Sequence, residues 1–499
     1  MKRFAWLLAA AVLTAPAFAQ DKPAPEKTPE KIDAPLVSIT KHTGNFGGVS
    51  VAYTATARET YLKAEDGTPK ASLFSTAYVK EGNDPARPVT FLFNGGPGSG
   101  SLWLHMGAFG PKRVAIPSDA RDDGAPPYPI VANPDSLLDV TDIVFIDPVG
   151  TGFSHALGKT EAKSYWGVTA DAKSIAEFIR IWLSENGRWN SPKYLGGESY
   201  GTTRSAAVAN ELEGSYNDVS LNGIILISTI LDFGAQAEVP GNEMSYVVNL
   251  PTMATTAWFH NKVADKPADV ATFAAEARAF AGGPYLSALF KGNRLAGEER
   301  AAIRKQLARF TGLSEQYLEN ADLRVAPGRF YKELLRDRKL TVGRLDTRYT
   351  GVDLDAAGEE PDNDPAFYGI DGGYTAAFNA YARGDLAFKT ERQYVTIGGV
   401  SDWDWKLGGR GNRDSEVYMS VAPYIGRTLR ENSGVRVFVG AAWYDFATPF
   451  FGAEYALSRM GMPADRIQFH YYDAGHMMYV RDQDRAKLSA DIRAFIRAR

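Results

Sequence analysis

The first candidate for a catalytic residue in this sequence is a serine with a glycine two positions before it and another two positions after it. Residues 197–201 read Gly-Glu-Ser-Tyr-Gly, with Ser199 at the centre of a G-x-S-x-G pattern. Apolar residues lead into it from Lys193, and small residues follow at helical density at 205–209. This order predicts a strand, a sharp turn and a helix. Such a turn exposes a nucleophilic serine at the end of a sheet. The backbone N–H of Tyr200 would then point to where an oxyanion forms.

A serine nucleophile needs a base, and histidine is the usual one. The sequence has six histidines, and only His470 and His476 fall within or after the last predicted strand, residues 467–472. His470 falls inside that strand, whereas His476 lies in the loop just beyond it. The base can reach Ser199 only from a loop beyond the ends of the strands. We therefore predict that His476 is the base.

The base in turn needs a carboxylate to orient it. The predicted strand at 435–439 is followed by Asp445, which we take as this acid. Asp473 is the second candidate, but it lies only three residues before His476. A turn aspartate can also simply cap a helix, and this is the alternative role for Asp445.

A glycine-rich turn at residues 94–100 follows an earlier buried strand at 89–93. It reads Asn-Gly-Gly-Pro-Gly-Ser-Gly, and its glycines let backbone N–H groups approach a ligand closely. We predict that Gly96 supplies the second oxyanion donor, beside Tyr200. A phosphate-binding loop would carry Gly-Lys-Ser or Gly-Lys-Thr after the turn, and neither follows here.

The elements that must hold these residues alternate between strand and helix. Near-continuous apolar runs predict parallel strands covered on both faces, at 89–93, 143–146, 223–228, 435–439 and 467–472, besides the short strand before Ser199. Apolar residues from Ile175 to Trp182 recur at helical spacing and predict a helix before that short strand. The alternation predicts an α/β class with a mostly parallel sheet. Antiparallel strands at 49–53 and 71–79 precede it.

The pattern changes between residues 233 and 405. Helical stretches occur at 269–280 and 298–310, separated by loops rich in Gly, Asp and Pro, and buried-strand signals are sparse. We therefore predict an inserted, largely helical cap at 233–405. The α/β core would consist of residues 35–232 and 406–499.

Composition narrows the class of protein. The chain has 499 residues, 44% of them hydrophobic, which is ample for a large core. It has no cysteine, which excludes disulfides, thiolate metal sites and a cysteine nucleophile. Its net charge of −4 gives no sign of nucleic-acid binding. We expect no metal and no cofactor.

The first residues predict export. Basic residues precede an apolar run at 4–13, and small residues up to Ala19 form a cleavage site, so we predict a signal peptide at 1–19. The run is too short to span a bilayer. Residues 20–34 are rich in Pro, Lys and Glu and predict a disordered leader. We expect a soluble mature protein without a membrane anchor, in the periplasm or outside the cell.

Taken together, these residues resemble the serine carboxypeptidase family of α/β-hydrolases, as a secreted bacterial member. The matching stretches run in the family's order, and they are 94–98, 145–154 (Phe-Ile-Asp-Pro-Val-Gly-Thr-Gly-Phe-Ser), 197–200, 445–449 and 475–477. The resemblance implies an α/β-hydrolase fold and release of C-terminal residues from peptide substrates through an acyl-enzyme. It implies the same nucleophile, base, acid and oxyanion donors as above.

The resemblance also implies that Asn94 and Glu198 hold the terminal carboxylate of the substrate. A carboxyl binds a carboxylate only while one of the two carries a proton, and a buried Glu with a raised pKa supplies that proton at acidic pH. The family's second glutamate is replaced here by Ala108. We suggest that Arg204 compensates, because a guanidinium binds a carboxylate bidentately. A helix-surface arginine is the alternative for Arg204.

Three functions stay open at this point. The first is a secreted serine carboxypeptidase. The second is an esterase or acyltransferase on the same scaffold, because a Ser-His-Asp triad is indifferent to the leaving group. The third is a non-catalytic binding protein, against which the complete set of Ser199, Asp445 and His476 argues. The oligomeric state is unknown, since the sequence carries no interface signal.

Overall fold

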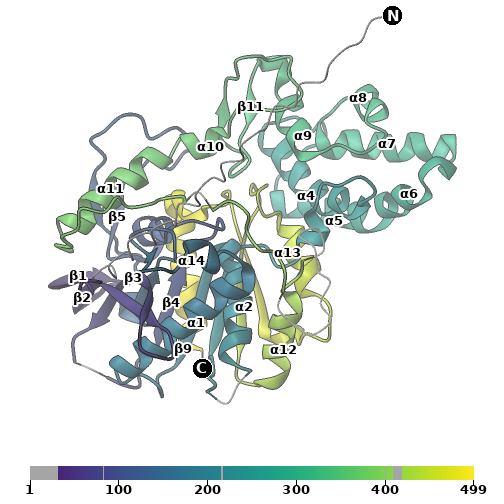
Figure 1. The fold of residues 1–499 in the computed structure, drawn as a ribbon. Coiled ribbons are helices and arrows are strands. Elements are labelled where there is room, and N and C mark those ends of the chain that lie inside the picture. Colours follow the sequence, from purple (N-terminus) through teal and green to yellow (C-terminus); the bar gives the residue numbers. More distant parts are fainter. Residues whose placement is uncertain (1–31, 83, 215–216, 399, 408–418, 499) are drawn as a thin grey trace, which may run out of the picture.

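The computed structural model describes residues 32–82, 84–214, 217–398, 400–407 and 419–498. The predicted signal peptide and the leader up to residue 31 lie outside these residues. Within them, the centre of the molecule is a ten-stranded sheet (Figure 1). The strands lie in the order β1 (Val37–Phe46), β2 (Val49–Lys63), β3 (Pro69–Lys80), β7 (Asp142–Ile146), β4 (Val89–Phe93), β9 (Lys193–Ser199), β10 (Gly223–Thr229), β13 (Arg436–Ala442) and β14 (Ile467–Tyr472), and the short β8 (His155–Ala156) pairs with β3.

The strands from β7 to β14 are parallel in every neighbouring pair. The first three strands are antiparallel, and β3 joins the parallel part through β7. This is the mostly parallel α/β-hydrolase sheet that the sequence predicts. Strand β1 was not predicted, because its apolar residues Val37 and Ile39 are exposed at the sheet edge and form no buried stripe.

Alternate side chains of the strands enter two different cores. Phe91 and its partner Val144 face the helices α1 (Val168–Glu185), α2 (Tyr200–Leu212) and α12 (Ala422–Glu431). Leu92 and its partner Phe145 face the opposite side, where α14 (Asp482–Arg497) packs. Because helices cover both faces of the sheet, these strands appear in the sequence as continuous apolar runs rather than as alternating polar and apolar residues.

The chain leaves the sheet after β10 and builds a helical cap with a core of its own. In Figure 1 these helices extend from one end of the sheet, at the upper right. They are α3 (Phe233–Gln236), α4 (Glu243–Phe259), α5 (Val270–Phe280), α6 (Leu286–Lys291), α7 (Gly297–Thr311), α8 (Glu315–Asn320) and α9 (Pro327–Glu333).

The later part of the predicted insertion returns across the hydrolase core. Its elements are the hairpin β11 (Thr341–Val342) and β12 (Thr350–Gly351), and the helices α10 (Pro365–Tyr368) and α11 (Asp371–Arg383). Tyr374 and Phe378 of α11 belong to the same apolar core as α14. Residues 233–405 therefore contain a separate helical body and a segment that packs on the sheet domain.

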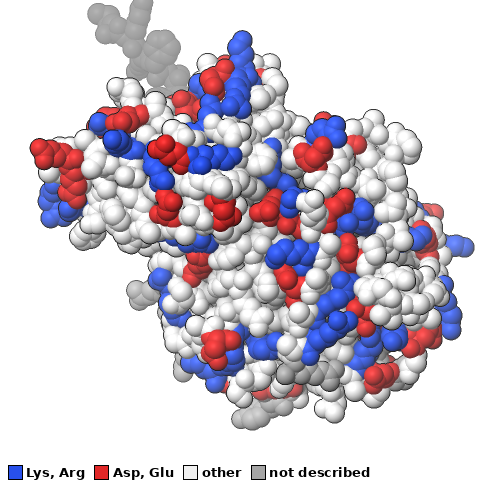
Figure 2. All heavy atoms as spheres, turned by 180° about the vertical axis from the view of Figure 1, so that it is seen from behind, with Lys and Arg blue, Asp and Glu red and all other residues white. Residues whose placement is uncertain are grey.

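Smaller elements complete the described chain. They are the hairpin β5 (Lys112–Val114) and β6 (Ile130–Ala132), the helix α13 (Phe450–Leu457), and the short 3-10 or π helices η1 (Leu104–Phe109), η2 (Leu137–Asp139), η3 (Ala162–Tyr165), η4 (Ala281–Tyr285), η5 (Gly292–Arg294), η6 (Arg336–Arg338), η8 (Ala464–Arg466) and η9 (Met478–Val480). Acidic and basic side chains are interspersed over the face seen in Figure 2. Among the described residues, no helix is both long and apolar enough to cross a membrane.

Candidate active site

Ser199 lies at the junction between strand β9 and helix α2, as the sequence predicts. Its φ is 61°, a region that non-glycine residues rarely adopt and that marks a strained turn. Gly197 makes the turn possible, because a Cβ there would lie 2.0 Å from the carbonyl oxygen of Gly201. The turn holds the serine at the carboxyl end of the central strand.

His476 and Asp445 meet at the carboxyl ends of neighbouring strands. His476 follows β14, Asp445 follows β13, and His476 Nδ1 lies 2.9 Å from Asp445 Oδ2. The buried carboxylate also accepts from the N–H groups of Ala447 and Thr448 and from the Thr448 hydroxyl. Because a carboxylate only accepts, Nδ1 carries the proton in this contact, which leaves Nε2 able to act as a base.

The second sequence candidate for the acid, Asp473, lies elsewhere. Its side chain is exposed and lies 3.8 Å from Arg481. Asp445 is therefore the carboxylate in contact with His476.

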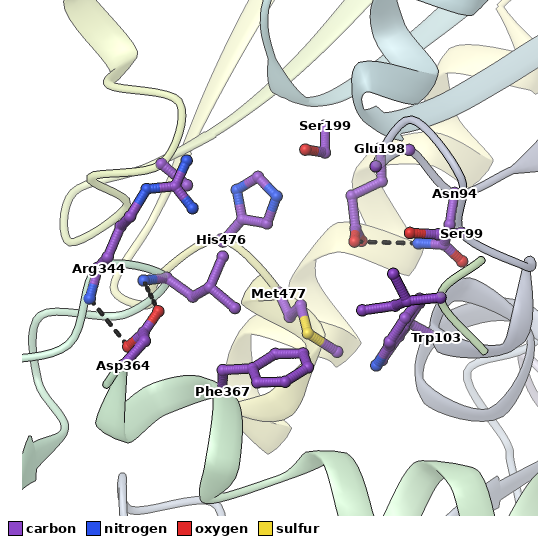
Figure 3. Close-up of a pocket in the computed structure, with 15 residues that line it drawn as sticks. Asn94, Ser99, Trp103, Glu198, Ser199, Arg344, Asp364, Phe367, His476 and Met477 are labelled. Atoms are coloured by element: carbon purple, nitrogen blue, oxygen red, sulfur yellow. Dashed lines mark hydrogen bonds between the residues drawn. The ribbon is translucent and has the colours of Figure 1, made fainter. Parts of the chain in front are cut away.

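Ser199 and His476 line one cavity of about 360 Å³ (Figure 3). Gly96, Asn94 and Glu198 line the same cavity. Tyr200 is the first residue of α2, where backbone N–H groups have no acceptor within the helix. Its buried ring packs against Trp403, with the ring centroids 5.4 Å apart. The predicted nucleophile, base and Gly96 are thus brought together, with Tyr200 directly behind the serine.

Asn94 and Glu198 form a buried pair at one end of this cavity. Asn94 Nδ2 donates to Glu198 Oε1 over 3.0 Å, and Asn94 Oδ1 accepts from the N–H of Leu104, which fixes the amide orientation. Glu198 Oε2 has no hydrogen-bond partner among the residues that the structure describes. Burial raises the pKa of Glu198 to about 7, although the charge of His476 opposes the rise. The carboxyl is therefore protonated in acid and can donate to an anion.

The pKa of His476 is also raised. Burial lowers this pKa, but the charge of Asp445 and its hydrogen bond outweigh burial, and Glu198 adds to the rise. The imidazolium that forms when His476 takes a proton is thus stabilised by its surroundings.

Arg204 does not fit the predicted role in carboxylate binding. Its guanidinium is fully buried and is not part of the cavity wall. Nε donates to Asp171 Oδ2 over 2.6 Å, and Nη1 donates to the backbone carbonyl of Asn94. The alternative, a surface arginine, is wrong as well. Small residues on α2 leave room for the guanidinium to reach inward, where it supports the turn that carries Asn94.

Part of the cavity wall was not predicted from the sequence. Most of these residues come from the cap, and they are Arg344, Leu345, Asp364, Phe367 and Ile397, besides Trp103, Ala447 and Met477 of the hydrolase core. Ala108, for which the resemblance expects a glutamate, is buried within η1 and does not line this cavity. No local periodicity marks the cap residues, so a sequence pattern alone could not find them.

Comparison with known proteins agrees with this geometry over part of the chain. Residues 52–270 match the family model for serine carboxypeptidase. Serine carboxypeptidase-like 7 from Arabidopsis thaliana is 32% identical over 164 residues, which cover 32% of this chain and 36% of the relative. Serine carboxypeptidase-like 13 from the same plant is 30% identical over 165 residues, covering 33% and 37%. The chain thus spans about a third of the length of these curated relatives.

A solved structure has the same fold over most of the chain. The prohormone-processing carboxypeptidase KEX1(delta)p from Saccharomyces cerevisiae superposes with a TM-score of 0.51 and 14% identity, covering 89% of this chain and 90% of that one. The sheet order and this superposition show the α/β-hydrolase fold. The segment that matches the serine carboxypeptidase family model contains Asn94, Glu198 and Ser199. Asp445 and His476 lie beyond the matched residues, so their assignment rests on geometry.

Proposed function

We propose that this protein is a serine-type carboxypeptidase that releases C-terminal residues from peptides through an acyl-enzyme. The observation that carries the proposal is the pairing of Glu198 with Asn94 in the cavity that Ser199 and His476 also line. A protonated carboxyl and an oriented amide can bind the terminal carboxylate of a peptide. That contact would place the last peptide bond near the serine.

Acylation uses the three triad side chains. Ser199 Oγ attacks the carbonyl carbon of the last peptide bond, while His476 Nε2 takes the hydroxyl proton. The N–H groups of Gly96 and Tyr200 stabilise the oxyanion. The C–N bond then breaks, His476 gives its proton to the leaving amine, and an ester to Ser199 remains. Asp445 holds the imidazole in the required tautomer throughout.

Deacylation repeats the sequence with water. Water loses a proton to His476 and attacks the ester carbon, and the returning proton restores the serine hydroxyl. The released amino acid carries the carboxylate that Asn94 and Glu198 recognised. Its departure opens this end of the cavity to the water.

A second function, acyl transfer or ester hydrolysis, is favoured by one observation. Ala108 stands where the family has a second glutamate, so the carboxylate site holds one carboxyl rather than two. A weaker carboxylate site would lower selection for free-acid peptides while leaving the triad competent. The same triad accepts an alcohol leaving group and an acceptor other than water.

The test compares three substrates with a common acyl part. An N-blocked dipeptide, its C-terminal amide and the corresponding simple ester are incubated at pH 4.5 and 7.5, with Ser199→Ala as the blank. A carboxypeptidase cleaves the free acid well above the amide, and its free-acid rate relative to its ester rate is higher at pH 4.5 than at pH 7.5. Ester hydrolysis with no preference for the free acid would replace the proposal with the acyl-transfer alternative. A flat peptidase rate from pH 4 to 9 would remove Glu198 from carboxylate recognition.

We further propose that the protein is exported by a signal peptide at residues 1–19. The basic start, the short apolar run and the small residues up to Ala19 support this proposal. Expression in a bacterium, fractionation and N-terminal sequencing provide the measurement. A mature chain that begins at Gln20 is expected, and full-length protein retained in the cytoplasm would contradict export.

A further inference from the structure

A second cavity adjoins the one that contains Ser199. Its volume is about 500 Å³, and it shares only Arg344 and Ala447 with the first cavity. Its other walls come mainly from the cap, including Gln236, Glu238 and Tyr331, and from the segment after Asp445. The two cavities therefore meet at Arg344 and Ala447.

Arg344 presents a positive charge at this junction from a fixed backbone. Its N–H donates to Asp364 Oδ1 over 3.0 Å, and its carbonyl accepts from the N–H of Phe446 over 3.2 Å. The side chain is exposed, and its guanidinium has no ion pair and no hydrogen bond within the described part of the chain. The backbone is held while the charged end is available to a ligand.

The position of Arg344 relative to the carboxylate pair indicates which part of a substrate it meets. Figure 3 shows Arg344 on one side of His476, with Asn94 and Glu198 on the other. A peptide whose terminal carboxylate lies at Asn94 and Glu198 directs its remaining residues away from that end. The second cavity, which lacks both residues, is the space that adjoins the site on the other side.

We propose that Arg344 makes the site selective for substrates with an acidic side chain in the residue before the scissile bond. This inference rests on the proposed function, because it uses the direction in which a peptide is bound. A guanidinium and a carboxylate form a strong, bidentate pair when water is partly excluded. The acidic residue would extend toward the second cavity and meet Arg344 at its entrance.

The charged groups near Arg344 form no ion pair with its guanidinium among the described residues. Asp364 faces the cavity, but its carboxylate accepts from the N–H groups of Arg344, Leu345 and Ala366 and caps helix α10. Glu238 lines the second cavity without forming an ion pair with Arg344 among the described residues. Burial raises the pKa of Glu238 and Glu360 adds to the rise, while the charge of Arg344 opposes it. His476 contributes a charge of the same sign as Arg344 when protonated.

The experiment compares glutamate with its neutral isostere before the scissile bond. N-blocked Glu-Ala, Gln-Ala and Lys-Ala are assayed at pH 6, where the free glutamate side chain is ionised. The corresponding α-esters of blocked Glu and Gln are assayed in parallel. We expect the native protein to prefer Glu over Gln by about fivefold or more in kcat/KM. Arg344→Gln should bring this ratio close to one, and Arg344→Glu should favour Lys.

Two controls separate this inference from general effects. Arg294→Gln removes an exposed cap arginine that lines neither cavity and should keep the native Glu/Gln ratio. Calorimetric binding of blocked Glu-Ala and Gln-Ala to Ser199→Ala, with and without Arg344→Gln, gives a readout that does not depend on turnover. Folding of each variant is checked by thermal denaturation.

The outcomes distinguish this inference from the proposed function. A Glu preference in the esters, without peptide cleavage, would support Arg344 while overturning the carboxypeptidase. Peptide cleavage with a Glu/Gln ratio that Arg344→Gln leaves unchanged would overturn the role of Arg344 alone. If turnover is absent with both substrate types, equal binding of Glu-Ala and Gln-Ala overturns it, and a difference that Arg344→Gln abolishes supports it.

Discussion

The backbone carbonyl of Leu345, a cap residue, accepts a hydrogen bond from the N–H of His476 over 2.6 Å. The carbonyl of His476 in turn accepts from the Ser228 hydroxyl over 2.5 Å, at the end of strand β10. The N–H of the preceding residue, Gly475, donates to the carboxylate of Asp346. The loop of the proposed base is therefore held between the cap and the sheet. The cap thus helps to position the proposed triad and also lines the cavity.

The close approach of Gly475 to Asp346 gives a direct test of this support. A Cβ at Gly475 would lie 2.3 Å from the Cβ of Asp346, so Gly475→Ala must displace the loop or the cap segment. We expect kcat to fall about 100-fold, because a shift of about 1 Å in a catalytic group has an effect of this size. Steady-state kinetics on the ester substrate measure it.

Gly297→Ala is the matched control for this change. Gly297 is the first residue of cap helix α7, and a Cβ there meets no atom within 4 Å. Its kcat should stay close to that of the native protein. Native kinetics in Gly475→Ala would show that the contact with Asp346 does not position His476.

Much of the fold and the centre of the site could be predicted because their signals are local. A strand covered on both faces produces a continuous apolar run, and the elbow requires glycine where Gly197 meets Gly201. The order of strands then brings His476 and Asp445 to one edge of the sheet. Each of these strands and turns is marked by residues that are near each other in the chain, even though the segments themselves are distant.

The remaining site residues depend on contacts between distant segments. Arg344 and Leu345 enter the site because the cap folds back onto the loops after β13 and β14, and no periodicity in the cap reports this return. Arg204 shows a different limit. An arginine on a helix of small residues can face solvent or reach inward, and its buried partners, Asp171 on helix α1 and the Asn94 carbonyl, decide which.

The buried pair of Arg204 and Asp171 predicts a large effect on stability. Arg204→Met leaves the carboxylate of Asp171 buried without its cation, and loss of one partner of a buried pair costs about 3–5 kcal/mol. The free energy of unfolding, measured by denaturant titration, should fall by this amount. The double variant Arg204→Met, Asp171→Leu should recover a large part of it, because no unpaired charge remains. A single variant as stable as the native protein would contradict this role.

Asp445→Asn tests the tautomer of His476. The Asp445 oxygen that faces Nδ1 would be replaced by an amide NH2, which donates and therefore favours the tautomer with the proton on Nε2. That nitrogen could no longer accept from Ser199, and kcat should fall about 10⁴-fold. The rate of Ser199 labelling by an organophosphonate should fall in parallel.

Asp473→Asn provides the comparison for this carboxylate. Asp473 is exposed, and among the described residues its carboxylate forms no ion pair closer than the 3.8 Å contact with Arg481, so its loss should leave labelling close to the native rate. A similar loss of labelling in both variants would deny Asp445 a specific role.

The pKa of Glu198 predicts a fall in activity at alkaline pH for the free-acid peptide and not for the ester. As pH rises through about 7, Glu198 loses its proton, and a free-acid peptide then faces a second carboxylate, so its kcat/KM should fall. An ester has no terminal carboxylate and should lack this alkaline fall. Both substrates should be cleaved more slowly in acid, because His476 becomes protonated. Burial lowers the pKa of His476, but Asp445 raises it by more.

Glu198→Gln separates the two groups in one variant. The amide still donates a hydrogen bond but does not titrate, so the alkaline fall for the free-acid peptide should disappear. Removal of the Glu198 charge also lowers the pKa of His476, so the acid limb should move to lower pH for both substrates. The full pH profiles of kcat/KM for peptide and ester measure both shifts. If the alkaline fall persists in Glu198→Gln, a group other than Glu198 controls it.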